Sequence, residues 1–230
     1  MPLAKLGPVS AGFQLVWRVF STPESTDEDR AVGIWVLENP DAPLDAMTQQ
    51  EFDDGDERMP YFGTIWASAE SLVEHVLSGP RLDGLTVLDL GCGLGPCGFA
   101  AARRGARVTF FDWEPRALEI VALSVREQTW MTEAPELLVG DWREPPPCGP
   151  FDLILGADVL YEWRNAPAVA RFLGPRLKAD GEAWIADPGR GAAEPFPGYA
   201  QRAGLKVHGP EPLTPQPHGQ AIKLLVVRRG

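Results

Sequence analysis

Hydrophobic and polar positions in the first 60 residues follow a pattern typical of strands and loops. Residues 13–20 and 31–37 are rich in β-branched and aromatic side chains, and the segment between them is polar with turn-forming residues. This arrangement predicts a β-hairpin. Residues 38–60 contain Pro, Asp and Gly with little periodicity, which favours a loop, and their acidic run at 51–57 is typical of a solvated segment. Hairpin and acidic loop together form the first expected unit, residues 1–60.

Strand-like and helix-like segments alternate through the second expected unit, residues 61–230. Apolar residues recur at helical spacing from Ile65 to Leu77, and the Ser-Gly-Pro that follows is typical of a helix end. Further helices are predicted over residues 98–104, 115–128, 166–177 and 199–203, and strands over residues 86–90, 107–111, 136–139, 151–157, 183–186, 205–208 and 221–228.

This alternation predicts an α/β fold with a parallel, doubly wound sheet, because parallel strands need crossover connections. The last two predicted strands are joined without a helix by residues 209–220, so we expect them to pair antiparallel. The sequence therefore predicts a Rossmann-like sheet of seven strands, mostly parallel with an antiparallel last strand, and a small N-terminal β-hairpin.

A glycine-rich turn connects the first strand of this sheet to its helix in residues 87–98 (VLDLGCGLGPCG). Glycines allow a tight turn and a close approach of backbone N–H groups to a ligand. Residues 93–98 match GxGxxG in letters, which is also compatible with a dinucleotide. Asp89 at the strand end favours a cationic ligand instead, since a carboxylate repels a pyrophosphate. S-adenosylmethionine, which carries an ammonium and a sulfonium, is the cofactor that this pattern predicts.

Two further acids follow predicted strand ends, where ligands of open α/β sheets bind. Asp112 lies about 20 residues after the glycine turn, where an acid meets ribose hydroxyls in nucleotide-binding folds. NAD enzymes share this feature, so it does not distinguish the cofactors. Asp141 can accept a hydrogen bond from an adenine amino group, and its neighbour Trp142 can pack on the ring.

Composition and charge narrow the class of protein. Hydrophobic residues make up 44% of the chain, and no apolar run reaches the roughly 18 residues that span a bilayer. The N-terminus lacks a signal-peptide pattern, so we expect a cytoplasmic protein. The three cysteines and three histidines have no metal-ligand spacing, so no metal is expected. A net charge of −11 disfavours nucleic acid and membranes and favours a basic protein partner, or it only maintains solubility.

Four short motifs carry a family resemblance over residues 60–228. The motifs are GTIW at 63–66, DW at 141–142, DVLY at 158–161 and DPGR at 187–190. With them the chain resembles the class I, seven-strand S-adenosylmethionine-dependent methyltransferases, and among them the family 16 protein-lysine methyltransferases, including the electron transfer flavoprotein β-subunit lysine methyltransferase branch. The resemblance implies a cofactor site lined by Trp66, Gly91, Cys92, Gly93, Asp112, Trp142 and Ala157. On residue type alone, Trp66 and Trp142 fit ordinary core packing, since Trp is usually well buried, and the resemblance favours the cofactor site instead.

Asp158 and Tyr161 are the expected catalytic residues on the acceptor side. They follow the apolar strand at 151–157, and their i, i+3 spacing would place both side chains on one face if the segment is helical. Asp158 would attract a lysine ammonium, and Tyr161 would shape its channel. Purely structural roles are the alternatives to these functional ones: a helix cap at Asp158, a core ring at Tyr161 and a salt-linked turn at residues 187–190.

We therefore expect a methyltransferase that acts on a lysine side chain of a protein. The segment after residue 157 lacks the Asn/Asp-Pro-Pro-Tyr motif that serves amino groups of bases. Its absence disfavours a nucleic acid as the substrate. A methyltransferase of small molecules and a NAD-dependent or non-enzymatic Rossmann-like binding protein are the alternatives.

Overall fold

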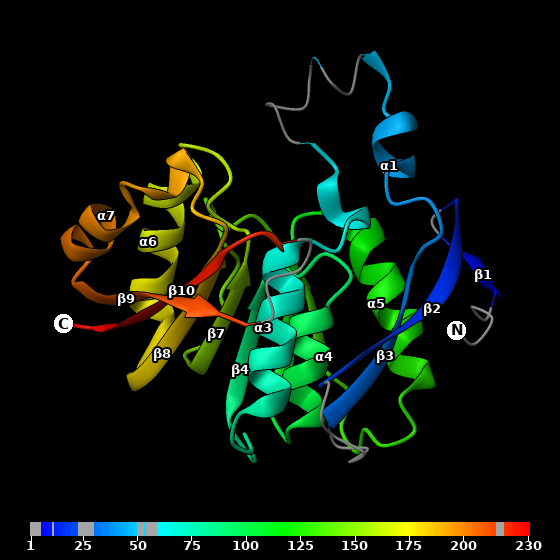
Figure 1. Ribbon diagram of the computed structural model, residues 1–230, viewed down its shortest axis with the longest axis horizontal. Helices are drawn as coiled ribbons and strands as arrows, with labels where there is room; N and C mark the ends of the chain where they lie inside the picture. Colours follow the sequence, from blue (N-terminus) through cyan, green and yellow to red (C-terminus); the bar gives the residue numbers. More distant parts are fainter. Residues whose placement is uncertain (1–5, 11, 23–29, 50–52, 54–58, 215–218) are drawn as a thin grey trace.

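A seven-stranded sheet with helices on both faces organises the computed structural model, which describes residues 6–10, 12–22, 30–49, 53, 59–214 and 219–230 (Figure 1). The strand order is β6-β5-β4-β7-β8-β10-β9. The strands are β4 (Thr86–Leu90), β5 (Arg107–Asp112), β6 (Glu136–Val139), β7 (Phe151–Ala157), β8 (Leu177–Asp187), β9 (Leu205–Leu213) and β10 (Ile222–Arg229). The helices are α3 (Ala67–Ser78), α4 (Pro96–Arg103), α5 (Pro115–Glu127), α6 (Asn165–Arg176) and α7 (Phe196–Arg202), and η3 (Gly191–Ala193) is a short 3₁₀ turn.

Alternate residues of each central strand pack into two separate cores. Leu153 and Leu155 of β7 join the cluster under α3, α4 and α5, whereas Ile154 joins the cluster under α6 and α7. Both faces of the sheet are covered, so its central strands are apolar along their length. The carboxyl ends of β4, β5 and β7 consequently meet at one edge, between the two helical layers.

The last strand is antiparallel to both of its neighbours, β8 and β9, as the sequence predicts. β9 runs to Leu213, so its predicted end at residue 208 is wrong. Pro210 and Pro212 lie inside it, and β9 tolerates them because it is an edge strand with one unpaired side. β8 likewise begins six residues before its predicted start at 183 (183 − 177 = 6).

The N-terminal hairpin is confirmed and belongs to a three-stranded sheet. β2 (Phe13–Ser21) pairs antiparallel with β3 (Ala31–Leu37), and β1 (Leu6–Ser10) adds a third strand on β2. This sheet packs on α3, α4 and α5 and shares their core through buried side chains such as Leu15 and Ile34. Gln128 at the end of α5 also donates a hydrogen bond to the Gly33 carbonyl at 2.7 Å.

The predicted loop at 38–60 is not wholly irregular, because residues 42–45 form the short helix α1 (Ala42–Asp45). The 3₁₀ turn η2 (Tyr61–Gly63) follows this segment. Pro43 in the first turn of α1 suits a helix start. The acidic run at 51–57 lies outside the described residues, apart from Asp53. None of the described helices has the length and apolar character that a membrane span requires.

Candidate active site

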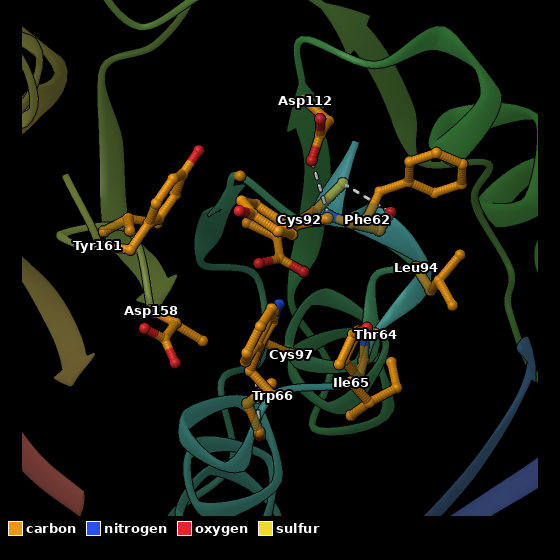
Figure 2. A pocket seen from close by; sticks show the side chains of 18 of the residues that line it. Phe62, Thr64, Ile65, Trp66, Cys92, Leu94, Cys97, Asp112, Asp158 and Tyr161 are labelled. Carbon is orange, nitrogen blue, oxygen red and sulfur yellow. Dashed lines mark hydrogen bonds between the residues drawn. The ribbon is translucent and has the colours of Figure 1, made fainter. Parts of the chain in front are cut away.

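A cavity of about 320 Å³ opens at the carboxyl ends of β4, β5 and β7, within the size range of small-molecule sites (Figure 2). Asp158 and Tyr161 lie on one side of it, and Phe62 and Leu94 lie on the opposite side. Every predicted site residue except Asp141 lines this cavity; these are Trp66, Asp89, Gly91, Cys92, Gly93, Asp112, Trp142, Ala157, Asp158 and Tyr161.

The glycine turn forms the floor of the cavity between β4 and α4. Gly91 and Gly93 have φ angles of 62° and 52°, in the left-handed region that glycine adopts without strain. A Cβ atom on Gly91 would lie 2.8 Å from the Trp142 ring, so no larger residue fits without displacing that ring. Gly91 and Gly93 line the cavity without side chains, so their backbone faces it, as a cofactor cradle requires.

Asp89 and Asp112 are the two buried carboxylates of this floor. Asp89 accepts a hydrogen bond from the Gly98 N–H of α4 at 2.7 Å, and burial raises its pKa to about 8. Asp112 accepts one from Gly93 N–H at 2.8 Å and one from Glu114 N–H at 2.9 Å. Burial raises the pKa of Asp112 to about 6. The negative charge of Asp112 also raises the pKa of Asp89, and within the described chain neither carboxylate is ion-paired.

Asp141 and Trp142 separate in the structure. Trp142 lines the main cavity beside Gly91. The Asp141 carboxylate instead accepts hydrogen bonds from the backbone N–H and the Nε of Arg143, each at 2.8 Å, and faces a smaller adjacent pocket. The adenine contact expected of Asp141 therefore stays a prediction, whereas Trp142 is at the cavity as expected.

The buried carboxylate of Asp158 forms an ion pair with the half-buried Arg190 at the edge of the cavity. Its φ of 58° is the single left-handed value among described non-glycine residues, and aspartate tolerates that conformation better than most residues do. Its Oδ1 accepts a hydrogen bond from Arg190 Nε at 2.7 Å, and its Oδ2 is 3.4 Å from Ser68 Oγ. Asp187 closes the turn that carries Arg190 by accepting from backbone N–H groups. The salt link of this turn is therefore to Asp158 and not to Asp187.

Tyr161 reaches the cavity without a helical segment, because residues 158–164 form bends and turns and α6 begins at Asn165. Its ring meets Tyr61 edge-on, with centroids 6.0 Å apart, and Tyr61 meets Trp66 in the same way at 6.0 Å. Burial raises the pKa of Tyr161 to about 12, so the phenol is neutral at physiological pH.

Sequence reasoning missed several cavity residues. Tyr61 and Phe62 directly precede the GTIW motif, and this position beside a motif was the available signal. Arg190 was noticed as part of the DPGR turn but not placed at the cavity. Glu162 carries no local signal that distinguishes it from a surface acid.

Comparison with known proteins agrees with this architecture. Residues 87–181 match the family model described as a methyltransferase domain. The chain is similar to protein N-lysine methyltransferase METTL21A of Danio rerio, with 35% identity over 50% of this chain and 56% of that protein. It is also similar to the electron transfer flavoprotein beta subunit lysine methyltransferase of Xenopus laevis, with 32% identity over 57% of this chain and 53% of that protein.

Other similar proteins are not named as lysine methyltransferases. The ubiquinone biosynthesis O-methyltransferase of Xanthomonas campestris is 29% identical over 49% of this chain and 47% of that protein. The structure of a TehB-like SAM-dependent methyltransferase from Corynebacterium glutamicum superposes with a TM-score of 0.55 and 22% identity, over 84% of this chain and all of that one. The chain spans about half the length of the curated relatives that it matches. Residues 87–181 are therefore similar to a methyltransferase domain, and the chain shares the fold of the S-adenosylmethionine-dependent methyltransferase structure on which it superposes.

Proposed function

We propose that the protein transfers a methyl group from S-adenosylmethionine to a lysine side chain of a protein. The observation that supports this cofactor is the pair of buried carboxylates, Asp89 and Asp112, which face one cavity and form no ion pair with any described residue. Buried charges without partners are costly, so such a pair suits a ligand that brings positive charge. S-adenosylmethionine brings two cations, and a pyrophosphate would add two anions.

The lining residues fit the three parts of this cofactor. Asp112 at the end of β5 presents its carboxylate to the cavity, and carboxylate oxygens are acceptors that suit ribose hydroxyls. Trp142 offers a ring face near the glycine turn for the adenine. Gly91 and Gly93 line the cavity without side chains, and Asp89 near the end of β4 suits the methionyl ammonium.

The cofactor supplies an activated methyl group, and transfer to an amine is an in-line displacement in which the nitrogen forms the new bond as the sulfur leaves. Positioning is the main contribution of the protein. The lysine ammonium must first release its proton to water. Tyr161 is not the base, because a phenol with a pKa near 12 holds its own proton. Its ring instead lines the approach of the amine together with Tyr61 and Trp66.

A lysine acceptor is supported by the aromatic wall, the acidic surface and the similar proteins. Trp66 is 37% exposed, so the aromatic wall extends from the cavity to the surface, where a long methylene stem can enter. The net charge of −11 attracts a basic protein surface. Two of the similar proteins are named as lysine methyltransferases. The O-methyltransferase among the matches keeps a small-molecule acceptor as the second candidate.

Labelling of proteins distinguishes these two acceptors. Tritiated S-adenosylmethionine and the purified protein are added to a lysate from cells that lack it, and labelled bands are analysed by mass spectrometry. We expect label in discrete protein bands, located on lysine, that is absent without the enzyme. Label confined to the small-molecule fraction would reject the lysine proposal and support the second candidate.

The affinity for S-adenosylhomocysteine is expected to rise with pH between about 6 and 8. In this interval the free protein holds a proton on Asp89, whose pKa is about 8, whereas Asp112, whose pKa is about 6, becomes ionised at the lower end. An ammonium binds the ionised carboxylates, so binding below these pKa values must release protons. Calorimetry in buffers of different ionisation enthalpy measures both the affinity and the protons released.

Asp89→Asn is the matched variant for this linkage. It keeps an acceptor for Gly98 N–H and removes the charge, so it should weaken binding at pH 8 and flatten the pH dependence. The free energy of unfolding gives a second readout. The unfolded chain releases the Asp89 proton near pH 3.8 and the folded protein near 8, so ligand-free wild type loses stability as pH rises between these values. A pH-independent affinity with no proton release would contradict the assignment.

A further inference from the structure

We propose that Arg190 binds the α-carboxylate of the cofactor, an inference that rests on the proposed function. The methionyl end of S-adenosylmethionine is a zwitterion, with an ammonium and a carboxylate on the same carbon. That carboxylate is the single anionic group of the molecule. A cavity that receives it therefore needs a cationic or N–H donor group at the methionyl end.

Among the described side chains that line the cavity, one is a candidate to bind this carboxylate. The described lining residues include four acids, Asp89, Asp112, Asp158 and Glu162, and one basic residue, Arg190. Four acids against one base favour the ammonium and sulfonium and repel the carboxylate. Arg190 is consequently the described side chain that can offset this repulsion.

The guanidinium of Arg190 is oriented and still has free donors. Its Nε donates to Asp158 Oδ1 at 2.7 Å, and its Cζ lies 5.6 Å from the centroid of the Trp66 ring. No described residue accepts a hydrogen bond from its two Nη groups, and its side chain is 36% exposed. A guanidinium held on one edge and open on the other can bind a carboxylate in the bidentate geometry that arginine favours.

The turn that carries Arg190 holds its backbone in place before any ligand binds. Asp187 Oδ1 accepts from the backbone N–H of Gly189 at 2.6 Å and of Arg190 at 2.9 Å. The Asp187 side chain is buried, and Gly189 adopts the left-handed φ of 83° that the turn requires. A preorganised arginine loses less conformational entropy on binding than a mobile surface arginine would.

The sheet order places Arg190 at the methionyl end. The neighbouring strands run β5-β4-β7-β8, with Asp112 at the end of β5 and Arg190 after the end of β8. The adenosyl end lies at β5 if Asp112 binds the ribose. The cofactor then extends across β4 toward β7, and its amino-acid end points toward Arg190 and Trp66.

Two ligands and two variants test this contact by calorimetry. The ligands are S-adenosylhomocysteine and its analogue in which hydrogen replaces the carboxylate. Wild type should bind S-adenosylhomocysteine about 10–100-fold more tightly than the analogue, the range of a charged hydrogen bond. Arg190→Gln should lose that factor for S-adenosylhomocysteine and keep the wild-type affinity for the analogue. Arg202→Gln, an arginine that packs on the Tyr199 ring outside the cavity lining, should change neither affinity.

The ligand comparison in wild type needs no mutation, so it tests the contact even if Arg190→Gln folds poorly. Equal affinity of wild type for the two ligands would overturn the contact and leave the proposed function intact. An equal loss for both ligands in Arg190→Gln would also overturn it, because Arg190 would then act through Asp158. If wild type binds neither ligand, the proposed function itself fails.

Discussion

Methyl transfer by Asp158→Asn and by Tyr161→Phe is expected to fall by about 10²-fold or more, the usual loss when a positioned catalytic group is removed. Both residues line the cavity, where Tyr161 is part of the aromatic wall formed with Tyr61 and Trp66. Asparagine suits position 158 because it tolerates the φ of 58° and can still accept from Arg190 Nε. Phenylalanine at 161 keeps the edge-on contact with Tyr61 and removes the hydroxyl.

Measuring cofactor affinity distinguishes a catalytic role of Asp158 and Tyr161 from a structural one. Both variants should bind S-adenosylhomocysteine within a few-fold of wild type if, as we propose, the groups they remove face the acceptor. Tyr199→Phe is the matched control, since Tyr199 lies in α7 outside the cavity lining. Turnover is measured on the protein that the labelling experiment identifies. Wild-type turnover in both variants would place the acceptor site elsewhere and remove the main support for a lysine acceptor.

Asp112→Ala is expected to weaken S-adenosylhomocysteine binding by about 10–100-fold, the value of a charged hydrogen bond to ribose. The same change removes the acceptor for Gly93 N–H and Glu114 N–H. Each buried N–H left without an acceptor costs about 1–3 kcal/mol, and water or local relaxation recovers part of this cost. The free energy of unfolding should therefore also fall. Calorimetry gives the affinity, and urea titration gives the stability.

Asp152→Ala is a matched control for this variant. Asp152 lies at the amino end of β7, away from the cavity, and accepts hydrogen bonds from Thr86 and Lys178. Its removal should lower stability and leave S-adenosylhomocysteine affinity unchanged. If Asp112→Ala also loses only stability, Asp112 supports the glycine turn and does not contact the ribose.

The glycine turn was predictable because its chemistry is local. A buried strand, three glycines and an acid within residues 86–95 determine a turn whose backbone faces a ligand. Asp112 and Ala157 followed from the same rule, because each is the last residue of a parallel strand. The strands at 86–90, 136–139 and 151–157 have their predicted bounds, since apolar runs with clear flanking breaks leave little ambiguity.

The other parts of the site depend on contacts between distant residues. Arg190 contacts Asp158 across 32 positions of the sequence, and Tyr61 of η2 contacts Tyr161 of the segment after β7. No local sequence pattern predicts either contact. Asp141 shows the opposite case, because its local pairing with Arg143 turns its carboxylate away from the main cavity. The first strand, residues 6–10, was missed because its Gly and Pro weaken the strand pattern.

The cofactor is the central claim, and calorimetry with S-adenosylhomocysteine and NAD tests it most directly. The two ligands share an adenosine and differ in charge at the other end, so the buried pair of Asp89 and Asp112 should select between them. We expect saturable binding of S-adenosylhomocysteine at one site per chain and no heat of binding with NAD. Binding of NAD, or no binding of S-adenosylhomocysteine to the folded protein, would contradict the account.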